Sequence, residues 1–307
     1  MAATAPPPTE LVADPTVEVL ATGFAYTEGP TWQQAEQRLL FHDIVEDIRY
    51  GWTAADGLTV VKQPTHKGNG MAVDVEGRLL VCEQTLNRVV RHELDGSITV
   101  LAAEYEGKEL NSPNDLAVRS NGDVIFSDPA YGRIPVYGED RPQQLDFQGV
   151  YRVRGDGGGL ELLTKDQVQP NGLCFSPDEQ RFYVDDCELG DIWAYEVAAD
   201  GTLGDGSVLC EGIGVPCPWE DCINDTLPSG YLDGMKCDER GNIYVTALGG
   251  VLILSPAGEK LGLIELTEDL ANFTWGGPEN RDLFVCCRSF IGRVTMAVGP
   301  AYTGGVA

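Results

Sequence analysis

An all-β fold is predicted by this sequence of 307 residues, on three observations. Short apolar runs rich in β-branched and aromatic residues alternate with turn signals along the chain. Glycine occurs 37 times and proline 18 times, which is typical of a chain with many turns. One unit, made of a polar residue, an apolar run, a turn and a strand, recurs six times. Such recurrence indicates an architecture built by repeating one supersecondary unit.

Each copy of the repeated unit has its turn seven or eight residues after its first residue. In the copy NGMAVDVEGRLLV, Glu76 and Gly77 form the turn between two apolar runs. The copies NDLAVRSNGDVIF and DGMKCDERGNIYV have the same layout, which is typical of a β-hairpin. The copies start 41, 45, 57, 62 and 39 residues apart, at Glu28, Asn69, Asn114, Asn171, Asp233 and Asn272.

Short strands that repeat every ~40–50 residues fit the blades of a β-propeller. We therefore predict a six-bladed β-propeller with four antiparallel strands in each blade. The segment TVEVLATG near the N-terminus is expected to complete the last blade and close the ring. A β-sandwich is the alternative, but it does not require the same turn offset in six units. The propeller is expected to span residues 16–307 as one domain, after a flexible tail of residues 1–15.

The dipeptide Asn171-Gly172 lies before its hairpin and not between the two strands, so it is not the hairpin turn. The first strand of a propeller blade is the innermost, and the six first residues should therefore surround one central axis. All six carry a side-chain oxygen, although Asn and Asp are poor strand residues. Local bonding of an Asx side chain to its own backbone remains an alternative at any single position. The six residues together predict a functional site at the central axis.

The predicted ring offers two carboxylates, Glu28 and Asp233, and four amides. Hard cations prefer oxygen ligands, and Ca²⁺ accepts about 6–8 of them with a tolerant geometry. We expect one divalent cation, Ca²⁺ first, with Mg²⁺, Mn²⁺ or Zn²⁺ as alternatives. Such an ion can polarise a carbonyl and activate water. Asp233 could bind the ion and also accept a proton from the attacking water.

The formal net charge of −27 disfavours nucleic-acid and anionic membrane partners. The sequence contains no apolar run of the ~20 residues that a membrane helix requires. The N-terminus lacks the features of a signal peptide, and nine cysteines form no recognisable disulfide or zinc pattern. We therefore expect a cytoplasmic protein with reduced cysteines, either a monomer or a small homo-oligomer.

Motifs of other catalytic classes are absent from the sequence, including G-x-S-x-G, H-E-x-x-H and the P-loop. The second strand of each hairpin should return polar residues to the face of the ring. Glu83 and Asp128 end such strands, and Tyr131 follows one of them. We expect these residues to orient a substrate, although exposed acids at strand ends are a common alternative.

Four motifs, YTEGPTW, NSPNDLAV, PNGLCFSPDEQRFYVDD and DGMKCDERGNIYVT, occur in this order. Together they resemble the gluconolactonase and senescence-marker-protein family of six-bladed propellers. The resemblance implies a divalent metal in the central channel and hydrolysis of lactones. It implies metal ligands at Glu28, Asn171 and Asp233, with Asn114 binding metal or substrate, and it implies that Asp233 is the catalytic base or nucleophile.

We therefore expect a metal-dependent lactonase that acts on a sugar lactone or a related small lactone. A phosphotriesterase-like hydrolase, a lyase or isomerase acting on a carbonyl, and a non-catalytic calcium-binding propeller are the alternatives. The segment 212–232 is longer than the resemblance predicts, and it could form a lid that reshapes the pocket. The residues expected to contact substrate are Asn69, Glu83, Asn111, Asn114, Asp128, Tyr131 and Asn272.

Overall fold

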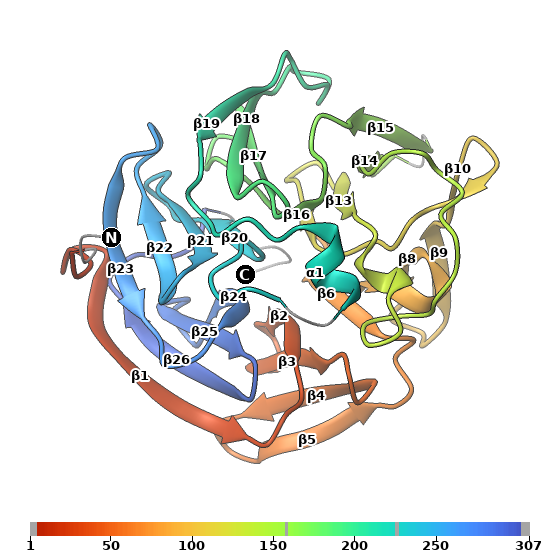
Figure 1. Cartoon of the computed structure of the whole chain (residues 1–307). Coiled ribbons are helices and arrows are strands. Elements are labelled where there is room, and N and C mark those ends of the chain that lie inside the picture. Colours follow the sequence, from red (N-terminus) through yellow and green to blue (C-terminus); the bar gives the residue numbers. More distant parts are fainter. Residues whose placement is uncertain (1–4, 157–158, 225–226, 302–307) are drawn as a thin grey trace.

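The computed structural model describes residues 5–156, 159–224 and 227–301. Within these ranges, six four-stranded antiparallel sheets stand around a central axis as the blades of a propeller (Figure 1). The predicted fold class is therefore confirmed. The blades follow one another along the chain, and each runs outward from its innermost strand, except that the sixth takes its outermost strand from the N-terminal segment.

The first three blades are formed by consecutive strands. The first contains β2 (Thr27–Gln33), β3 (Arg38–Asp43), β4 (Ile48–Thr53) and β5 (Gly57–Lys62). The second contains β6 (Gly68–Val73), β7 (Leu79–Glu83), β8 (Arg88–His92) and β9 (Ile98–Ala102). The third contains β12 (Leu116–Val118), β13 (Val124–Asp128), β14 (Gly149–Val153) and β15 (Leu160–Thr164). A two-stranded ribbon, β10 (Glu104–Tyr105) and β11 (Lys108–Glu109), lies between the second and third blades in sequence.

The last three blades include the closing strand. The fourth contains β16 (Pro170–Phe175), β17 (Arg181–Asp186), β18 (Asp191–Glu196) and β19 (Ser207–Cys210). The fifth contains β20 (Met235–Cys237), β21 (Ile243–Ala247), β22 (Gly250–Leu254) and β23 (Lys260–Glu265). The sixth contains β24 (Leu270–Gly276), β25 (Asp282–Cys287), β26 (Phe290–Met296) and β1 (Val12–Thr22).

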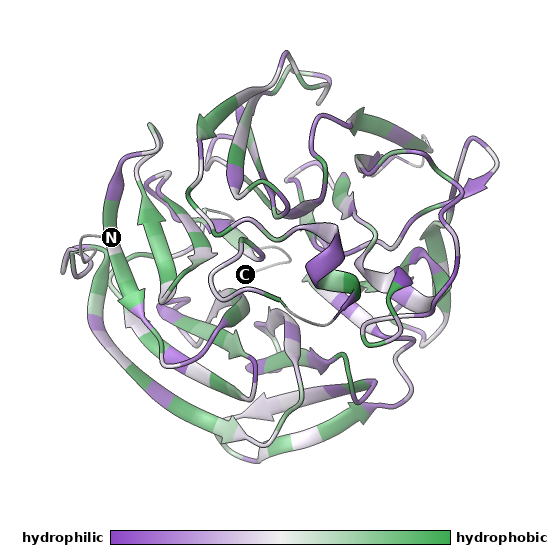
Figure 2. Ribbon diagram, viewed as in Figure 1, coloured by the Kyte–Doolittle hydropathy of each residue, from purple (hydrophilic) through white to green (hydrophobic). Residues whose placement is uncertain are grey.

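Helical structure is confined to short segments in the described residues. They are η1 (Gln84–Leu86), η2 (Tyr131–Arg133) and α1 (Trp219–Ile223), all far too short to span a bilayer. Helix α1 lies over the centre of the propeller (Figure 1) and carries both hydrophilic and hydrophobic residues (Figure 2). All nine cysteines are buried, and none of them forms a disulfide in the described residues.

The ring is closed by β1, which pairs antiparallel with β26 from Val12 opposite Met296 to Thr22 opposite Phe290. The predicted closure by an N-terminal strand is confirmed. The strand begins earlier than residue 16, where the sequence suggested the end of a tail, because Leu11 and Val12 are buried in the core of the sixth blade. Residues 1–4 of the expected tail lie outside the described residues.

The core consists of the apolar layers between neighbouring blades. On β17, Phe182 and Val184 pack against the third blade, in a cluster that includes Ile125. Tyr183, which lies between them in sequence, packs toward the fifth blade with Ile243. Successive side chains of a strand point to opposite faces, so both faces of each inner strand are buried. This explains the nearly continuous apolar runs that follow the turns.

Glycine allows the innermost strands to approach one another closely. Four of the six first residues are followed by glycine, and a Cβ added to Gly29 would lie 1.9 Å from the carbonyl oxygen of Asn69. A Cβ on Gly172 would lie 2.0 Å from the carbonyl oxygen of Asp233. The amide of Gly70 donates to the carbonyl of Asn114 at 2.8 Å, which links adjacent blades directly. Any larger residue would therefore push the inner strands apart.

Truncating the side chain of Leu11 should weaken the packing of the N-terminal strand that closes the ring. Leu11→Ala removes a side chain that is buried against the sixth blade, so we expect a loss of about 2–4 kcal/mol in the free energy of unfolding. The matched control is Val19→Ala on β1, whose side chain is 54% exposed and should matter by only about 0.5 kcal/mol. Urea unfolding measures both. Equal effects of the two variants would show that β1 does not seal the propeller.

A methyl group at the inner ring should be more disruptive than one at a blade edge. Gly172→Ala introduces a collision with the backbone of Asp233, and we expect destabilisation of about 1–3 kcal/mol or more. At Gly204 the nearest atom to an added Cβ is 3.7 Å away, so Gly204→Ala should leave stability unchanged or slightly improved. Thermal unfolding of the two variants tests the difference, and a harmless Gly172→Ala would contradict the packing described above.

Candidate active site

Five of the six predicted ring residues meet in one cavity at the centre of the propeller. The five are buried, with 2–5% of their surface exposed, and each lies at or just before the start of an innermost strand. The cavity is narrow, with about 40 Å³ of space for the centres of water-sized molecules. Its floor is formed by the side chains of Glu28, Asn69, Asn114, Asn171 and Asp233.

The two acids of the floor are in an environment that opposes ionisation. Burial raises the pKa of Glu28 to about 7, although the amide of Gly29 donates to its carboxylate and offsets part of the effect. Burial also raises the pKa of Asp233 well above its usual value, and the negative charge of Glu28 raises it further. Two buried carboxylates in one cavity repel each other unless a proton or a cation lies between them.

The amides of the floor supply oxygens that have no hydrogen-bond partner among the described residues. The Oδ1 atoms of Asn69 and Asn171 are both buried and unpaired, although they lie at the same cavity as the two carboxylates. A buried polar atom without a partner is costly, so such atoms in a cavity indicate a ligand that satisfies them. A cation coordinated by these oxygens would satisfy them, and its positive charge would also offset the repulsion between Glu28 and Asp233.

The donor set is that of a hard cation. Among the described residues, no group of three or more His, Cys, Asp or Glu side chains is arranged to hold a metal ion. The floor of the cavity instead combines two carboxylates with neutral amide oxygens, a mixture that Ca²⁺ tolerates well. The residues present therefore fit an oxygen-coordinated divalent cation better than a zinc or copper site built from imidazole or thiolate.

The sixth ring residue, Asn272, lies in a layer beside the floor and not in the lining of the cavity. Its Nδ2 atom donates to Oδ2 of Asp115 over 3.5 Å, and the ammonium of Lys236 lies 3.5 Å from its Oδ1 atom. Lys236 is also paired with Asp115 at 3.1 Å. This network joins the third, fifth and sixth blades beneath the cavity. The sequence pattern did not identify Asp115 or Lys236, although Asp115 stands where four other copies have glycine.

His42 holds one ring residue in place. Its Nδ1–H donates to the carbonyl of Asn69 at 2.8 Å, while its Nε2 atom accepts from Arg49 at 3.0 Å. These partners require the neutral imidazole. Burial, together with the positive charge of Arg49, lowers the pKa of His42 well below its usual value. The side chain is thus a positioning group for the second blade.

Acids at the ends of second strands anchor the loops that lead into the ring. Asp128 accepts from the amides of Asn111 and Ser112, both at 2.8 Å, immediately before Asn114. Asp186 accepts from the amides of Val168 and Gln169 in the same way before Asn171. These carboxylates therefore orient the backbone at the ring.

Three residues that the sequence suggested as substrate contacts are engaged with the protein instead. Glu83 is paired with Arg88 at 2.7 Å and with Lys62 at 3.6 Å. Asn111 donates from Nδ2 to the carbonyl oxygen of Phe147 at 2.9 Å. Neither of them nor Asp128 is among the described residues that line the cavity. Their geometry supports a role in positioning.

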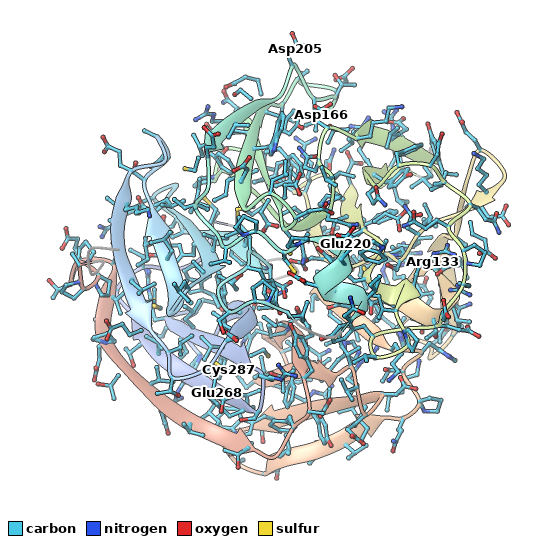
Figure 3. The ribbon with its side chains drawn as sticks, viewed as in Figure 1. Arg133, Asp166, Asp205, Glu220, Glu268 and Cys287 are labelled. Carbon is cyan, nitrogen blue, oxygen red and sulfur yellow. The ribbon has the colours of Figure 1, made fainter. Side chains whose placement is uncertain are left out.

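The backbone of Asn111 is also held by a residue of η2. The Nε atom of Arg133 donates to the carbonyl of Asn111 at 2.9 Å, and the same guanidinium reaches the carbonyls of Leu110 and Pro142. Arg133 lies on η2, next to the helix α1 that carries the exposed Glu220 (Figure 3). Tyr131, on the same short helix, lines the cavity, and its contact with a substrate stays a prediction.

The segment that departs from the family pattern covers the cavity from above. Cys217 and Tyr231 belong to it and line the cavity, and the hydroxyl of Tyr231 is hydrogen-bonded to that of Tyr26. The sulfur of Cys217 lies 3.2 Å from that of Cys222 on α1, and its amide donates to the carbonyl of Cys187. Residues 225–226 of the segment lie outside the described residues. The expected covering role agrees with this geometry.

Asp128 should make stability depend on pH. Burial raises the pKa of Asp128 to about 7, so the folded state binds a proton that the unfolded state releases near pH 4. The stabilisation is complete below about pH 4 and is lost as pH rises to 7. In urea unfolding with chelator present, the stability advantage of the wild type over Asp128→Asn should shrink between pH 5 and pH 8. An advantage that stays constant or grows would rule out this linkage.

Comparison with known proteins gives a consistent result. The family described as SMP-30/Gluconolactonase/LRE-like region matches residues 26–288. A gluconolactonase of Zymomonas mobilis is 30% identical over 296 residues, covering 91% of this chain and 80% of that protein. A pentonolactonase of Haloferax volcanii is 26% identical, covering 94% and 90%. The structure of a gluconolactonase from Xanthomonas campestris superimposes with a TM-score of 0.79 at 31% identity, covering 91% and 89%. The chain belongs to the SMP-30/gluconolactonase family.

Proposed function

We propose that this protein is a lactonase that hydrolyses the ester bond of a small lactone in the central cavity. The observation that carries the proposal is the pair of buried carboxylates beside unpaired amide oxygens at the floor of a cavity. Family membership supports the reaction class, since the named relatives include a gluconolactonase and a pentonolactonase.

One divalent cation, Ca²⁺ first, would be held by Glu28, Asn114, Asn171 and Asp233. When bound, it would supply Lewis acidity toward the lactone carbonyl and positive charge that offsets the two acids. The carboxylate and amide composition of the floor supports this assignment, as does the unpaired Oδ1 of Asn171. Asn69 would complete the ring as a contact to the substrate.

Asp233 would act as the general base. Its carboxylate would take a proton from a water molecule as the water oxygen attacks the carbonyl carbon of the lactone. The ring C–O bond then breaks, and the proton held by Asp233 passes to the departing alkoxide oxygen. The product is a hydroxy acid, which releases one proton to solvent at neutral pH. The buried setting of Asp233 excludes bulk water and favours proton transfer near neutral pH.

The experiment measures proton release from lactones with and without chelator. Chelation should abolish turnover, and added Ca²⁺ should restore it. Asp233→Asn should lower kcat by about 10²–10⁴-fold, because the general base is lost. The control is Asp205→Asn at the outer edge of the fourth blade, an exposed residue far from the axis (Figure 3), which should keep full activity. Full activity of Asp233→Asn would eliminate the proposed base.

Isotope labelling separates hydrolysis from other reactions of a carbonyl compound. In water enriched in ¹⁸O, hydrolysis places one labelled oxygen in the carboxylate of each product molecule. A lyase or isomerase need incorporate none. Absence of turnover with every lactone, despite stoichiometric calcium measured by elemental analysis, would favour a cation-binding propeller without catalysis.

A further inference from the structure

The walls of the cavity contrast with its floor. Apart from the oxygen atoms of the floor, one amide side chain and two thiols, the lining consists of aromatic and aliphatic side chains, namely Tyr26, Ile44, Tyr131, Tyr137, Leu227 and Tyr231. These residues belong to one apolar cluster that also contains Trp219 and the thiols at the covering segment. A ligand with its carbonyl at the floor would therefore have the rest of its surface against apolar groups.

The aromatic rings of the walls support one another. Tyr26 and Tyr137 pack edge to face with their centroids 5.4 Å apart. Tyr131 lies 6.3 Å from Trp219 of α1 in a tilted arrangement. The hydroxyls of Tyr26 and Tyr231 form a hydrogen bond with each other, so part of their hydrogen-bonding capacity is satisfied within the wall. The wall thus presents mainly ring surface, and its buried polar atoms without a hydrogen-bond partner among the described residues are Oε1 of Gln84 and the hydroxyl oxygen of Tyr131.

No basic side chain lines the cavity among the described residues. The fourteen lining residues include Glu28 and Asp233 but no Lys, Arg or His. Arg288 lines a neighbouring crevice together with Tyr26 and Tyr231, which are shared between the two spaces and form the partition. An anionic group on the substrate, away from the floor, would therefore find no basic side chain in the described lining to pair with.

We propose that the site selects neutral lactones that carry a flat, apolar part, such as an aromatic ring fused to the lactone, over polyhydroxylated or phosphorylated sugar lactones. The inference rests on the proposed function. The several hydroxyls of a sugar would lose water against the tyrosine and leucine walls, where the unpaired Oε1 of Gln84 and the hydroxyl of Tyr131 could replace only part of it. An aromatic ring would instead gain contact with Tyr131 and its neighbours. A phosphate would lose its water of hydration with no Lys, Arg or His side chain in the described lining to pair with it.

The test compares dihydrocoumarin, glucono-1,5-lactone and 6-phosphoglucono-1,5-lactone as substrates of the calcium-loaded protein. We expect kcat/KM for dihydrocoumarin to exceed that for gluconolactone by about tenfold or more, after correction for spontaneous hydrolysis. The phosphorylated lactone should be the poorest of the three. Equal or better turnover of either sugar lactone would overturn the proposed selectivity, while leaving the lactonase assignment intact.

The aromatic wall is tested by two variants of one residue. Tyr131→Ala should lower kcat/KM for dihydrocoumarin by about tenfold, a loss typical of one aromatic contact, and should change that for gluconolactone much less. Tyr131→Phe keeps the ring and should restore the preference for dihydrocoumarin. Equal losses with both substrates in Tyr131→Ala would contradict a role of the wall in selection.

Binding to a slowed enzyme separates the two proposals. Asp233→Asn should retain the apolar walls, so it should bind dihydrocoumarin about tenfold more tightly than gluconolactone in calorimetric titration. If the wild type hydrolyses no lactone but this binding preference is found, the lactonase proposal fails and the selectivity stands. Equal or tighter binding of gluconolactone overturns the selectivity, whatever the outcome for catalysis.

Discussion

The close approach of the innermost strands is the constraint on which the site depends. Glycine after four of the ring residues lets the backbone of one blade contact that of the next, with no side chain between them. The preceding residues are thereby brought to a common cavity, although they are separated by tens of residues in sequence. At Gly29, Gly70 and Gly172 the nearest neighbours are backbone atoms, so these contacts fix the positions of the ring residues with little dependence on side chains, whereas Gly234 packs against the side chain of Asn272.

This geometry places two acids where neither is well solvated. Burial and mutual repulsion oppose ionisation of Glu28 and Asp233, so the floor of the cavity costs stability when no ligand is present. The surrounding structure offsets the cost with fixed backbone bonds. Asp128 and Asp186 hold the loops before two ring residues, and His42 holds the carbonyl of a third. A strained or repulsive site supported in this way is typical of functional centres.

The blades and most of the ring could be predicted from the sequence, because each copy repeats a polar residue, an apolar run and a turn at fixed offsets. Asn272 shares that pattern but lies in the layer with Asp115 and Lys236, since ring position alone does not determine where a side chain points. The predicted contacts of Glu83, Asn111 and Asp128 with substrate depended on strand ends reaching the ring face. Their bonds to backbone and to basic side chains are tertiary contacts that no local pattern contains.

The pairing of β1 with β26 has a consequence for the order in which the molecule can assemble. Of the described strands, β1 is synthesised first and its partner β26 is synthesised last. The strand β1 therefore stays unpaired while the five other blades are synthesised. During that time its edge is unsatisfied and open to pairing with other chains, a known aggregation hazard. Blades one to five contain only strands that are neighbours in sequence, so they can form progressively as the chain leaves the ribosome, and the last blade alone requires a long-range encounter.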